Sequence, residues 1–403
     1  MANTTLTHSL VARMSAKILE EESPFLANIN RELADEYKQV RDYKPGQTVK
    51  VRIPPTGVVY DGATFAGGGS APDNTERYVD ATVQTQKPVA LTFGMREKTL
   101  EVTDFRERIL RPQMRVLASV LEADFLSRAY ALTPNIVGTA GSVPTTMKVY
   151  AQAREKMQNF LAPPGDRSCV FSSTANTELV DTSRQLFNPK PTIEKGFIEG
   201  TIGRAQGADF YEHQSIPTHT NGTQSSWTIN GASQTGSSLA IGGLTAGNTI
   251  KKGTIFTVPS VFAVHPLTGN EYTSLLQFVV TADFTASGTT GTISIYPPIQ
   301  PSASIQNRTV SASPANGATC TMFGSASTAY RQNLMFHKDA FAVGFLPLAV
   351  PAGFEGSTAT LPNGISVRVY TFGDGTNDRE STRIDVLPAW VGVRPEHACR
   401  ITE

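Results

Sequence analysis

Apolar residues recur at helical spacing through most of residues 7–36. The recurring positions are Leu10, Met14, Ile18, Leu26, Ile29 and Leu33. Intervals of three or four residues place side chains on one face of an α-helix. Pro24 divides the run into two pieces, because proline removes a backbone donor inside a helix. The pattern predicts a helical arm that must bury its apolar face, on its own fold or on a neighbouring molecule.

The pattern changes to strand periodicity between residues 48 and 93. Apolar and polar residues alternate over residues 49–53 and again over residues 79–93. Three consecutive glycines, Gly67–Gly69, lie between the two runs and give that stretch high backbone freedom. We expect a long two-stranded arm with a flexible tip. Because an isolated two-stranded arm is only marginally stable in water, it should lie on another surface.

The clearest helical pattern covers residues 103–132, with Thr103 or Asp104 as its cap. Pro112 predicts a kink or a restart one turn into the helix. The expected apolar face consists of Phe105, Ile109, Val116, Val120, Leu121 and Phe125. A long helix with one apolar face is expected to pack along a core.

Shorter elements follow this helix. A second helix is expected at about residues 145–161, and "SCVFSS" after it is typical of a short buried strand. Its apolar side is expected to hold Met147, Tyr150, Met157 and Leu161. Near the C-terminus, residues 364–396 are typical of two strands joined by a Gly/Asp/Asn turn.

Residues 222–330 form a compositionally distinct stretch, rich in Ser, Thr, Gly and Asn. Its charged residues are Lys251, Lys252, Glu271, Asp283 and Arg308. Short apolar runs recur between glycine-containing turns, which is typical of a small antiparallel barrel or of a sandwich. The flanks resemble linkers, so we expect a β-domain inserted into another domain.

Composition narrows the possible functions. Lys+Arg and Asp+Glu both number 35, and a chain that binds nucleic acid through counterion release normally has a basic excess. Charged residues make up only 17% of the chain, which suits a surface covered by neighbouring subunits. Three widely spaced cysteines favour a reduced, cytosolic chain without disulfides or zinc. No signal peptide and no membrane-spanning segment are expected.

Two motifs resemble chemical sites. His337, Lys338 and Asp339 are consecutive, but adjacent residues point in different directions, so we expect a polar helix start with Asp339 in its first turn. Phe336 and Phe341 beside them are expected core residues. Residues 371–385 place oxygen ligands at alternate positions, as a calcium loop does, but Arg379 stands where glycine is needed. A hairpin is the expected structure there.

Other candidates are weaker still. The triple glycine lacks the lysine of a phosphate-binding loop. Glu20, Glu21 and Glu22 lie on successive helix faces, and His213 and His219 lack a third ligand nearby. The sequence therefore predicts no catalytic residue, no metal ligand, no cofactor and no enzyme.

The order of the elements resembles the coat proteins of tailed double-stranded DNA bacteriophages, most closely the P-twenty-two-type coat protein family with the Hong Kong-97-type fold. The segments that carry this resemblance are, in order, "ARMSAKILEEESPFLANINRELADEY", "KPGQTVKVRIPPTGVVYDGATF", "EKTLEVTDFRERILRPQMRVLASVLEADF", "GTIGRAQGADFYEHQSIP", "NLMFHKDAFAV" and "IDVLPAWVGVRPEHACRI". They span nearly the whole chain.

The resemblance implies an α+β, Hong Kong-97-type capsid fold with an inserted antiparallel β-barrel-like domain. The implied domains are an N-terminal arm (1–45), an extended β-loop (46–95), a peripheral domain with a spine helix (96–145), an apical domain (146–221), the inserted domain (222–330) and a return to the core (331–403). The kinked spine helix and the loop tip are plausible hinges.

The resemblance also implies a major capsid protein that assembles as hexamers and pentamers into an icosahedral shell in the bacterial host cytoplasm. The shell would form around a scaffolding protein with a portal protein at one vertex, expand on DNA packaging, and enclose the genome without sequence-specific binding. A decoration protein is a further possible partner. The intersubunit residues expected are Leu10, Met14, Ile18, Leu26, Ile29, Leu33, Phe65, Gly67, Gly68, Gly69, Asp73 and Asn74. The alternative is a phage tail, decoration or adhesion protein that uses the β-rich insert.

Overall fold

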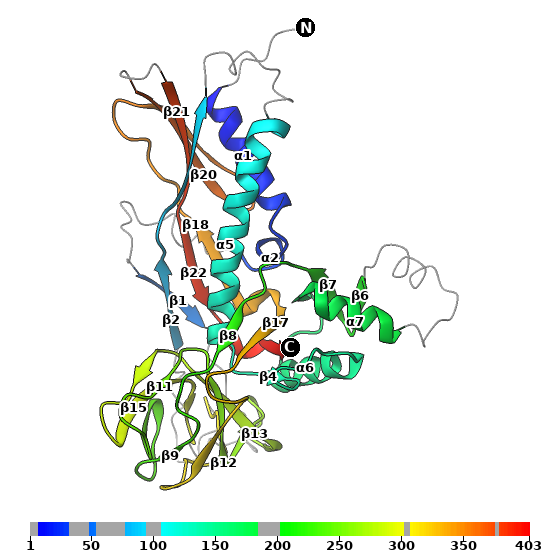
Figure 1. Ribbon diagram of the computed structural model, residues 1–403, viewed down its shortest axis with the longest axis vertical. Helices are drawn as coiled ribbons and strands as arrows, with labels where there is room; N and C mark the ends of the chain where they lie inside the picture. Colours follow the sequence, from blue (N-terminus) through cyan, green and yellow to red (C-terminus); the bar gives the residue numbers. More distant parts are fainter. Residues whose placement is uncertain are drawn as a thin grey trace, which may run out of the picture. The chain divides into compact units, whose positions relative to one another are not determined.

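The computed structural model describes residues 7–31, 48–53, 77–93, 106–183, 202–301, 307–374 and 379–403. They form an α+β fold (Figure 1), which confirms the expected class. The chain divides into two compact units. Unit 1 comprises Met1–Val51, Tyr78–Phe125 and Phe341–Val393, and unit 2 comprises Arg52–Arg77, Leu126–Ala340 and Arg394–Glu403.

Unit 1 contains two four-stranded sheets. The first has the order β19 (Glu355–Thr360), β20 (Ser366–Asp374), β21 (Arg379–Val386), β3 (Lys87–Phe93), and the second has the order β1 (Thr48–Ile53), β2 (Arg77–Val83), β22 (Pro388–Gly392), β18 (Phe341–Phe345). The expected two-stranded arm is thus only partly correct. β1 and β2 are neighbours, but β3 pairs with β21 in the other sheet. Alternation along a strand marks its faces and does not specify its partner.

Two short helices begin unit 1. α1 (His8–Glu21) and α2 (Pro24–Ala27) confirm the division at Pro24, which is the first residue of α2. Proline is tolerated there because the first helical N–H has no partner inside the helix. The Thr7 hydroxyl caps α1 by accepting a hydrogen bond from the Leu10 N–H, and α1 packs against β19 and β20.

One part of the core of unit 1 is a cluster of aromatic rings. The Trp390 ring stacks on Phe125 and on Phe341, with ring centroids 5.5 and 5.3 Å apart, and Phe25 lies 6.4 Å away. The prediction that Phe341 is a core residue is confirmed, since it is fully buried. These rings come from segments far apart in sequence, so the core forms only when they assemble.

The long helix, α5 (Arg111–Leu132), is preceded by a π-helical turn at Arg106–Leu110. Pro112 has no N–H to donate to the carbonyl of the preceding turn, which fits the expected restart. The expected face is wrong at Val116 and Val120, whose side chains are 58% and 47% exposed. The buried apolar positions from Leu110 to Phe125 are Leu110, Met114, Leu117, Ala118, Leu121 and Phe125. The apolar character of valine predicted that Val116 and Val120 are buried. The 3.6-residue period of the helix instead places Met114 and Ala118 on the buried face.

Unit 2 contains a mixed sheet with helices packed on it. The strand order is β4 (Ile136–Val137), β23 (Ala398–Thr402), β17 (Ala329–His337), β5 (Arg167–Phe171), β7 (Ala208–Glu212), β6 (Arg204–Ala205), and β8 (Thr218–Thr220) pairs with the start of β17. α6 (Met147–Asn159) packs on β23, β4 and β17, and α7 (Ser173–Ser183) follows β5. The expected helix and buried strand are confirmed in α6 and β5, although Leu161 is exposed.

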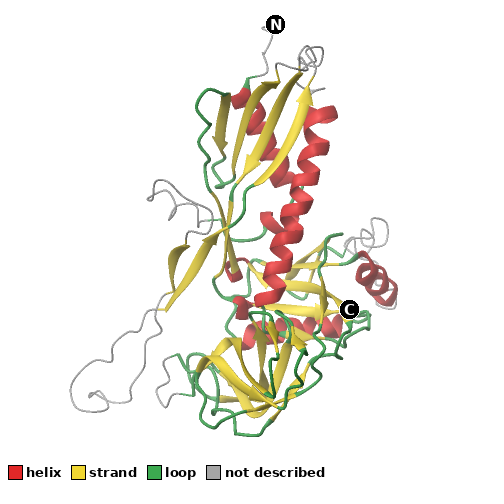
Figure 2. Cartoon of the chain, turned by 60° about the vertical axis from the view of Figure 1, so that its left-hand side comes forward, coloured by secondary structure: helices red, strands yellow, loops and turns green. Residues whose placement is uncertain are grey.

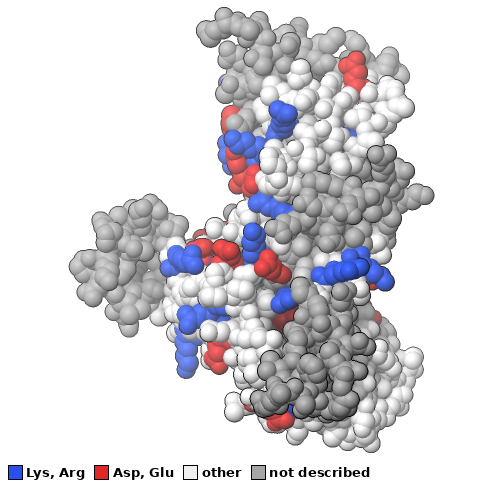
Figure 3. Space-filling view, turned by 180° about the vertical axis from the view of Figure 1, so that it is seen from behind, with Lys and Arg blue, Asp and Glu red and all other residues white. Residues whose placement is uncertain are grey.

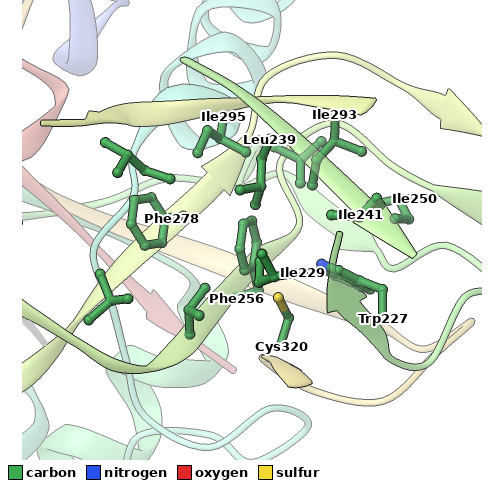
Figure 4. Close-up of a cluster of buried hydrophobic side chains, with 14 of the residues drawn as sticks. Trp227, Ile229, Leu239, Ile241, Ile250, Phe256, Phe278, Ile293, Ile295 and Cys320 are labelled. Carbon is green, nitrogen blue, oxygen red and sulfur yellow. The ribbon is translucent and has the colours of Figure 1, made fainter. Parts of the chain in front are cut away.

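Residues 227–322 of unit 2 contain a closed six-stranded barrel made of strands and loops (Figure 2). Its order is β10 (Gly236–Gly242), β15 (Thr290–Ile299), β13 (Glu271–Val280), β12 (Ile255–Val264), β16 (Thr319–Met322), β9 (Trp227–Ile229), while β11 (Thr249–Ile250) and β14 (Phe284–Thr285) pair separately. All barrel pairs are antiparallel. Trp227, Phe256 and Phe278 fill the interior (Figure 4). The structure therefore selects the barrel over the sandwich.

The chain leaves β17 through a single 3₁₀ turn, η4 (Lys338–Ala340), and enters β18 directly. The short helix expected here, ending before Pro347, is therefore wrong. Phe341–Phe345 is a fully buried strand, and such short apolar runs are ambiguous between helix and strand. Phe336 is buried as expected.

Candidate functional site

The three polar residues after Phe336 do not converge. His337 is buried, whereas Lys338 and Asp339 are exposed. The His337 Nδ1 accepts a hydrogen bond from the Asp339 N–H at 3.2 Å, so this nitrogen caps a turn. Burial lowers the pKa of His337, and nearby Arg167 and Lys338 lower it further, against the opposing effect of Asp339. The His337 imidazole therefore points into the protein, while the neighbouring Lys338 is exposed. The three side chains share no common centre, and His337 stabilises the turn.

The calcium-like stretch is a hairpin, as expected. β20 and β21 pair from Arg368↔Asp385 to Asp374↔Arg379. The Asp385 carboxylate is fully buried and accepts hydrogen bonds from Arg368 at 2.5 Å and Arg383 at 2.8 Å. Its oxygens are therefore occupied by two guanidinium groups, and the pKa of Arg383 is raised through its hydrogen bond to Asp385. This carboxylate links β21 to β20 within the sheet β19–β20–β21–β3.

The remaining titratable candidates have structural partners. Glu20, Glu21 and Glu22 each pair with a different cation. The part of the chain that the structure describes holds no group of three metal-ligating residues, and none of its helices is long and apolar enough to cross a membrane. The three cysteines are free and buried, and burial raises the pKa of the Cys320 and Cys399 thiols to about 12. Such thiols are inert at neutral pH.

The expected intersubunit residues fall into three groups. Ile18, Leu26 and Ile29 are buried within the chain itself, and Leu10 and Met14 are half-buried. Leu33, Phe65, Gly67, Gly68, Gly69, Asp73 and Asn74 lie outside the described residues. An intersubunit contact therefore stays a prediction for all of them, and for the three buried residues it requires the arm to leave its position.

The arm is held by charges that sequence reasoning missed. Glu22 at the end of α1 accepts hydrogen bonds from Arg111 at 3.0 Å and Arg115 at 2.9 Å on α5. Partial burial raises the pKa of Glu22, but the two arginines outweigh it and the net shift is downward. Glu122, fully buried on α5, accepts a hydrogen bond from the Phe25 N–H at 2.8 Å and so caps α2. No local sequence pattern indicates these contacts, because the partners are about 90 or more residues apart along the chain.

Within unit 2, a buried polar cluster joins the barrel to the mixed sheet. Arg400 on β23 is 1% exposed; its Nε donates to the Thr133 carbonyl and its Nη1 to the Gly253 carbonyl, at 2.9 and 2.8 Å. The guanidinium also lies 5.7 Å from the Tyr130 ring centroid. Burial lowers the pKa of Arg400 to about 9. Arg400 thus ties the C-terminal strand to the β11–β12 loop of the barrel.

The two connections to the barrel lie side by side in the same cluster. β8 pairs antiparallel with the start of β17, and Asn221 donates to the carbonyls of Phe323 and Ser325 and contacts the Tyr330 hydroxyl. His219 packs edge-on to Tyr130. Burial, and then the Arg400 charge, lower the pKa of His219 to about 4.

Three further contacts fix the barrel within unit 2. The Gln277 side-chain amide exchanges two hydrogen bonds with the Ile136 backbone, at 2.9 and 3.1 Å. The Tyr272 hydroxyl donates to the Asn159 carbonyl, and the Tyr296 hydroxyl donates to the Glu396 carboxylate. These hydrogen bonds connect the barrel strands β13 and β15 to the segments around Ile136, Asn159 and Glu396.

Comparisons with known proteins identify the class. A sequence model of the family described as "P22 coat protein - gene protein 5" matches residues 46–400, so the chain belongs to this phage coat protein family. The resemblance read from the sequence is confirmed. A major capsid protein of Acyrthosiphon pisum secondary endosymbiont phage 1 is 30% identical over 98 residues, which cover 24% of this chain and 23% of that relative. The matched part thus spans about a quarter of the relative's length.

Solved phage structures are also similar. A structure from Mycobacterium phage Che8 matches with 13% identity and a TM-score of 0.47, covering 94% of this chain and 90% of that one. The capsid structure of cyanophage P-SCSP1u matches with 11% identity and a TM-score of 0.41, covering 90% of each chain. The family assignment rests on the sequence match over residues 46–400.

Proposed function

We propose that this chain is a major capsid protein that self-assembles as hexamers and pentamers into the icosahedral shell around a phage double-stranded DNA genome. The observation that carries the proposal is the family match over residues 46–400. We further propose that the fold is of the Hong Kong-97 type, with the domain boundaries given above. The barrel would be the inserted domain, and α5 the spine helix of the peripheral domain.

The surface chemistry supports a structural role. Among the described residues on the face shown in Figure 3, basic and acidic side chains are interspersed. A shell that a motor fills with DNA does not need strong attraction for phosphates. The described cysteines, histidines and buried acids all serve packing or hydrogen bonding, which supports a protein without catalysis.

The proposed assembly pathway follows the family. A scaffolding protein would guide a precursor shell in the host cytoplasm, a portal protein would occupy one vertex, and expansion would follow packaging. The N-terminal arm would then contact an adjacent subunit, and the loop between β1 and β2 would overlay a neighbour.

Electron microscopy of the chain expressed with the scaffolding protein of the same phage tests the proposal. Closed shells or shell-like polymers are the expected result. A persistent monomer under these conditions would overturn the proposal and favour a tail or decoration protein that uses the barrel. Replacing the half-buried Leu10 and Met14 by Ser should leave a folded chain that forms no shells, because the buried positions of the arm stay intact. Normal shells would refute the role of the arm.

A further inference from the structure

A cavity of about 160 Å³ lies within unit 2, between the barrel and the C-terminal end of α6. Its apolar lining includes Ile53, Phe160, Val264, Leu276 and Pro297. A protein cavity of about 150 Å³ with an apolar lining can take up a benzene ring. The space therefore suits one aromatic or branched apolar side chain.

The rim of this cavity is apolar and exposed. Leu161 and Leu267 both line it, with side chains 37% and 53% exposed. They are two of the six large apolar residues left exposed in the described part of the chain. A small ligand inside the cavity would leave this rim in water, whereas a protein segment would cover both.

Leu161 occupies an unusual backbone conformation. Its φ is 63°, and the bonds Leu161 N–H to the Gln158 carbonyl and Ala162 N–H to the Met157 carbonyl form a Schellman motif at the end of α6. Glycine is the usual residue at this position, because a side chain meets steric strain in the left-handed region. The sequence keeps a leucine where glycine would suit the fold better.

The polar part of the cavity lining includes one cation, Arg394, that could pair with a charged group of an occupant. Glu396 accepts a hydrogen bond from Tyr296, and Arg308 donates to backbone carbonyls. Arg394 is half-buried, and its side chain has no hydrogen-bond or ion-pair partner among the described residues. The His397 Nε2 donates to the Phe160 carbonyl, while its buried Nδ1 has no partner in the described part of the chain. An occupant with a carboxylate would complement this lining.

We propose that the cavity receives an apolar side chain, with an adjacent carboxylate, from a second copy of this chain. The inference rests on the proposed function, because a shell places further copies of the chain beside every subunit. It goes beyond that function by naming the surface: the rim of Leu161 and Leu267 and the cation of Arg394.

Leu161→Gly and Leu267→Ser test the rim. Leu161→Gly should leave the melting temperature of the unassembled chain unchanged or raised, because glycine relieves the strain, yet reduce the shell yield about tenfold or more. Leu267→Ser and Arg394→Gln should also reduce assembly without loss of folding. Gln206→Gly is the matched control: Gln206 has a φ of 51° and lies in the β6–β7 turn, away from the cavity, so this change should not affect assembly.

Cross-linking identifies the occupant. The three native cysteines are buried, so Thr268→Cys, exposed beside Leu267 but not part of the cavity lining, offers one exposed thiol in the described part of the chain for a photoreactive maleimide. In shells, a coat–coat adduct is expected, with the attached peptide containing an apolar residue next to Asp or Glu. An adduct to another protein alone, or normal assembly of both rim variants, would overturn the inference. If the unaltered chain forms no shells, the proposed function fails instead.

Discussion

The barrel and unit 1 both bury a hydrophobic core, but they build it from differently arranged parts of the chain. The barrel strands come from one continuous stretch, residues 227–322, and enclose their own core. Unit 1 is assembled from three separate stretches, and β3 finds its partner β21 almost 300 residues later in the chain. Even the barrel pair that is most distant in sequence, β9 with β16, closes a shorter loop than β3 with β21. The barrel therefore loses less loop-closure entropy, and we expect it to fold before the sheets of unit 1 are complete.

The two tryptophans of the chain report on these regions separately. Trp227 lies in the barrel core and Trp390 in the core of unit 1. Each can be observed alone after the other is replaced by Phe, and this makes the comparison measurable by fluorescence in urea.

Phe278→Ala should have the largest effect. Phe278 is fully buried and stacks on Phe256 with centroids 5.6 Å apart, so truncation should cost about 3–5 kcal/mol. The transition reported by Trp227 should move to lower urea, and that of Trp390 should stay. Equal shifts of both transitions would show that the two regions unfold as one.

Asp385→Ala is the corresponding change in unit 1. It leaves Arg368, itself 9% exposed, without its acidic partner, and breaking a buried pair in this way costs about 3 kcal/mol or more. The Trp390 transition should shift and the Trp227 transition should not. A shift seen mainly by Trp227 would contradict the division into two regions.

Acid should weaken unit 2 before unit 1. His219 binds its proton less readily when folded, since its pKa falls from 6.5 to about 4, so the unfolded state gains protons first as the pH drops. Stability from this group should fall between pH 6.5 and 4, by about 2 kcal/mol at pH 5. His337 and His397, also in unit 2, have lowered pKa values and act in the same direction.

Urea titrations at pH 7 and pH 5 measure this loss. His219→Gln should flatten the pH dependence, although it also lowers stability at neutral pH. The same acid dependence in the variant would show that other groups carry the effect.

Glu22→Gln should have the smallest effect. The two arginine contacts are partly exposed, and such pairs contribute about 0–1 kcal/mol each. Only the Trp390 transition should shift, by less than about 2 kcal/mol. A larger loss would show that the arm is essential to the core of unit 1.

The same contrast decides what could be predicted from the sequence. Strand runs in the barrel were found because alternation and glycine turns are local, but β9 was missed since it has three residues. The predicted apolar face of α5 is wrong at Val116 and Val120, because an apolar residue on a helix can also lie on the exposed side. The Arg400 cluster has no local signal, since its partners Thr133 and Gly253 come from distant segments.

The candidate site divides in the same manner. The helical arm was predicted as an element, and its contacts with other subunits stay predictions. The cavity beside Leu161 was not predicted, because its rim combines the end of a helix with a barrel loop. A leucine after a helix where glycine is typical was the one signal that the sequence offered.

The paired connections β8 and β17 have an evolutionary consequence. Thr220 faces Ala329 and Thr218 faces Arg331, so the chain leaves for the barrel and returns from it on neighbouring strands. Residues 221–328, which include the barrel, therefore connect β8 and β17 in the way that a hairpin loop connects two adjacent strands. Any module whose ends lie one strand spacing apart, about 5 Å, could be exchanged at this position without changing the register of the sheet. The position at which the chain leaves and re-enters the sheet therefore separates the register of the host sheet from the structure of the inserted barrel.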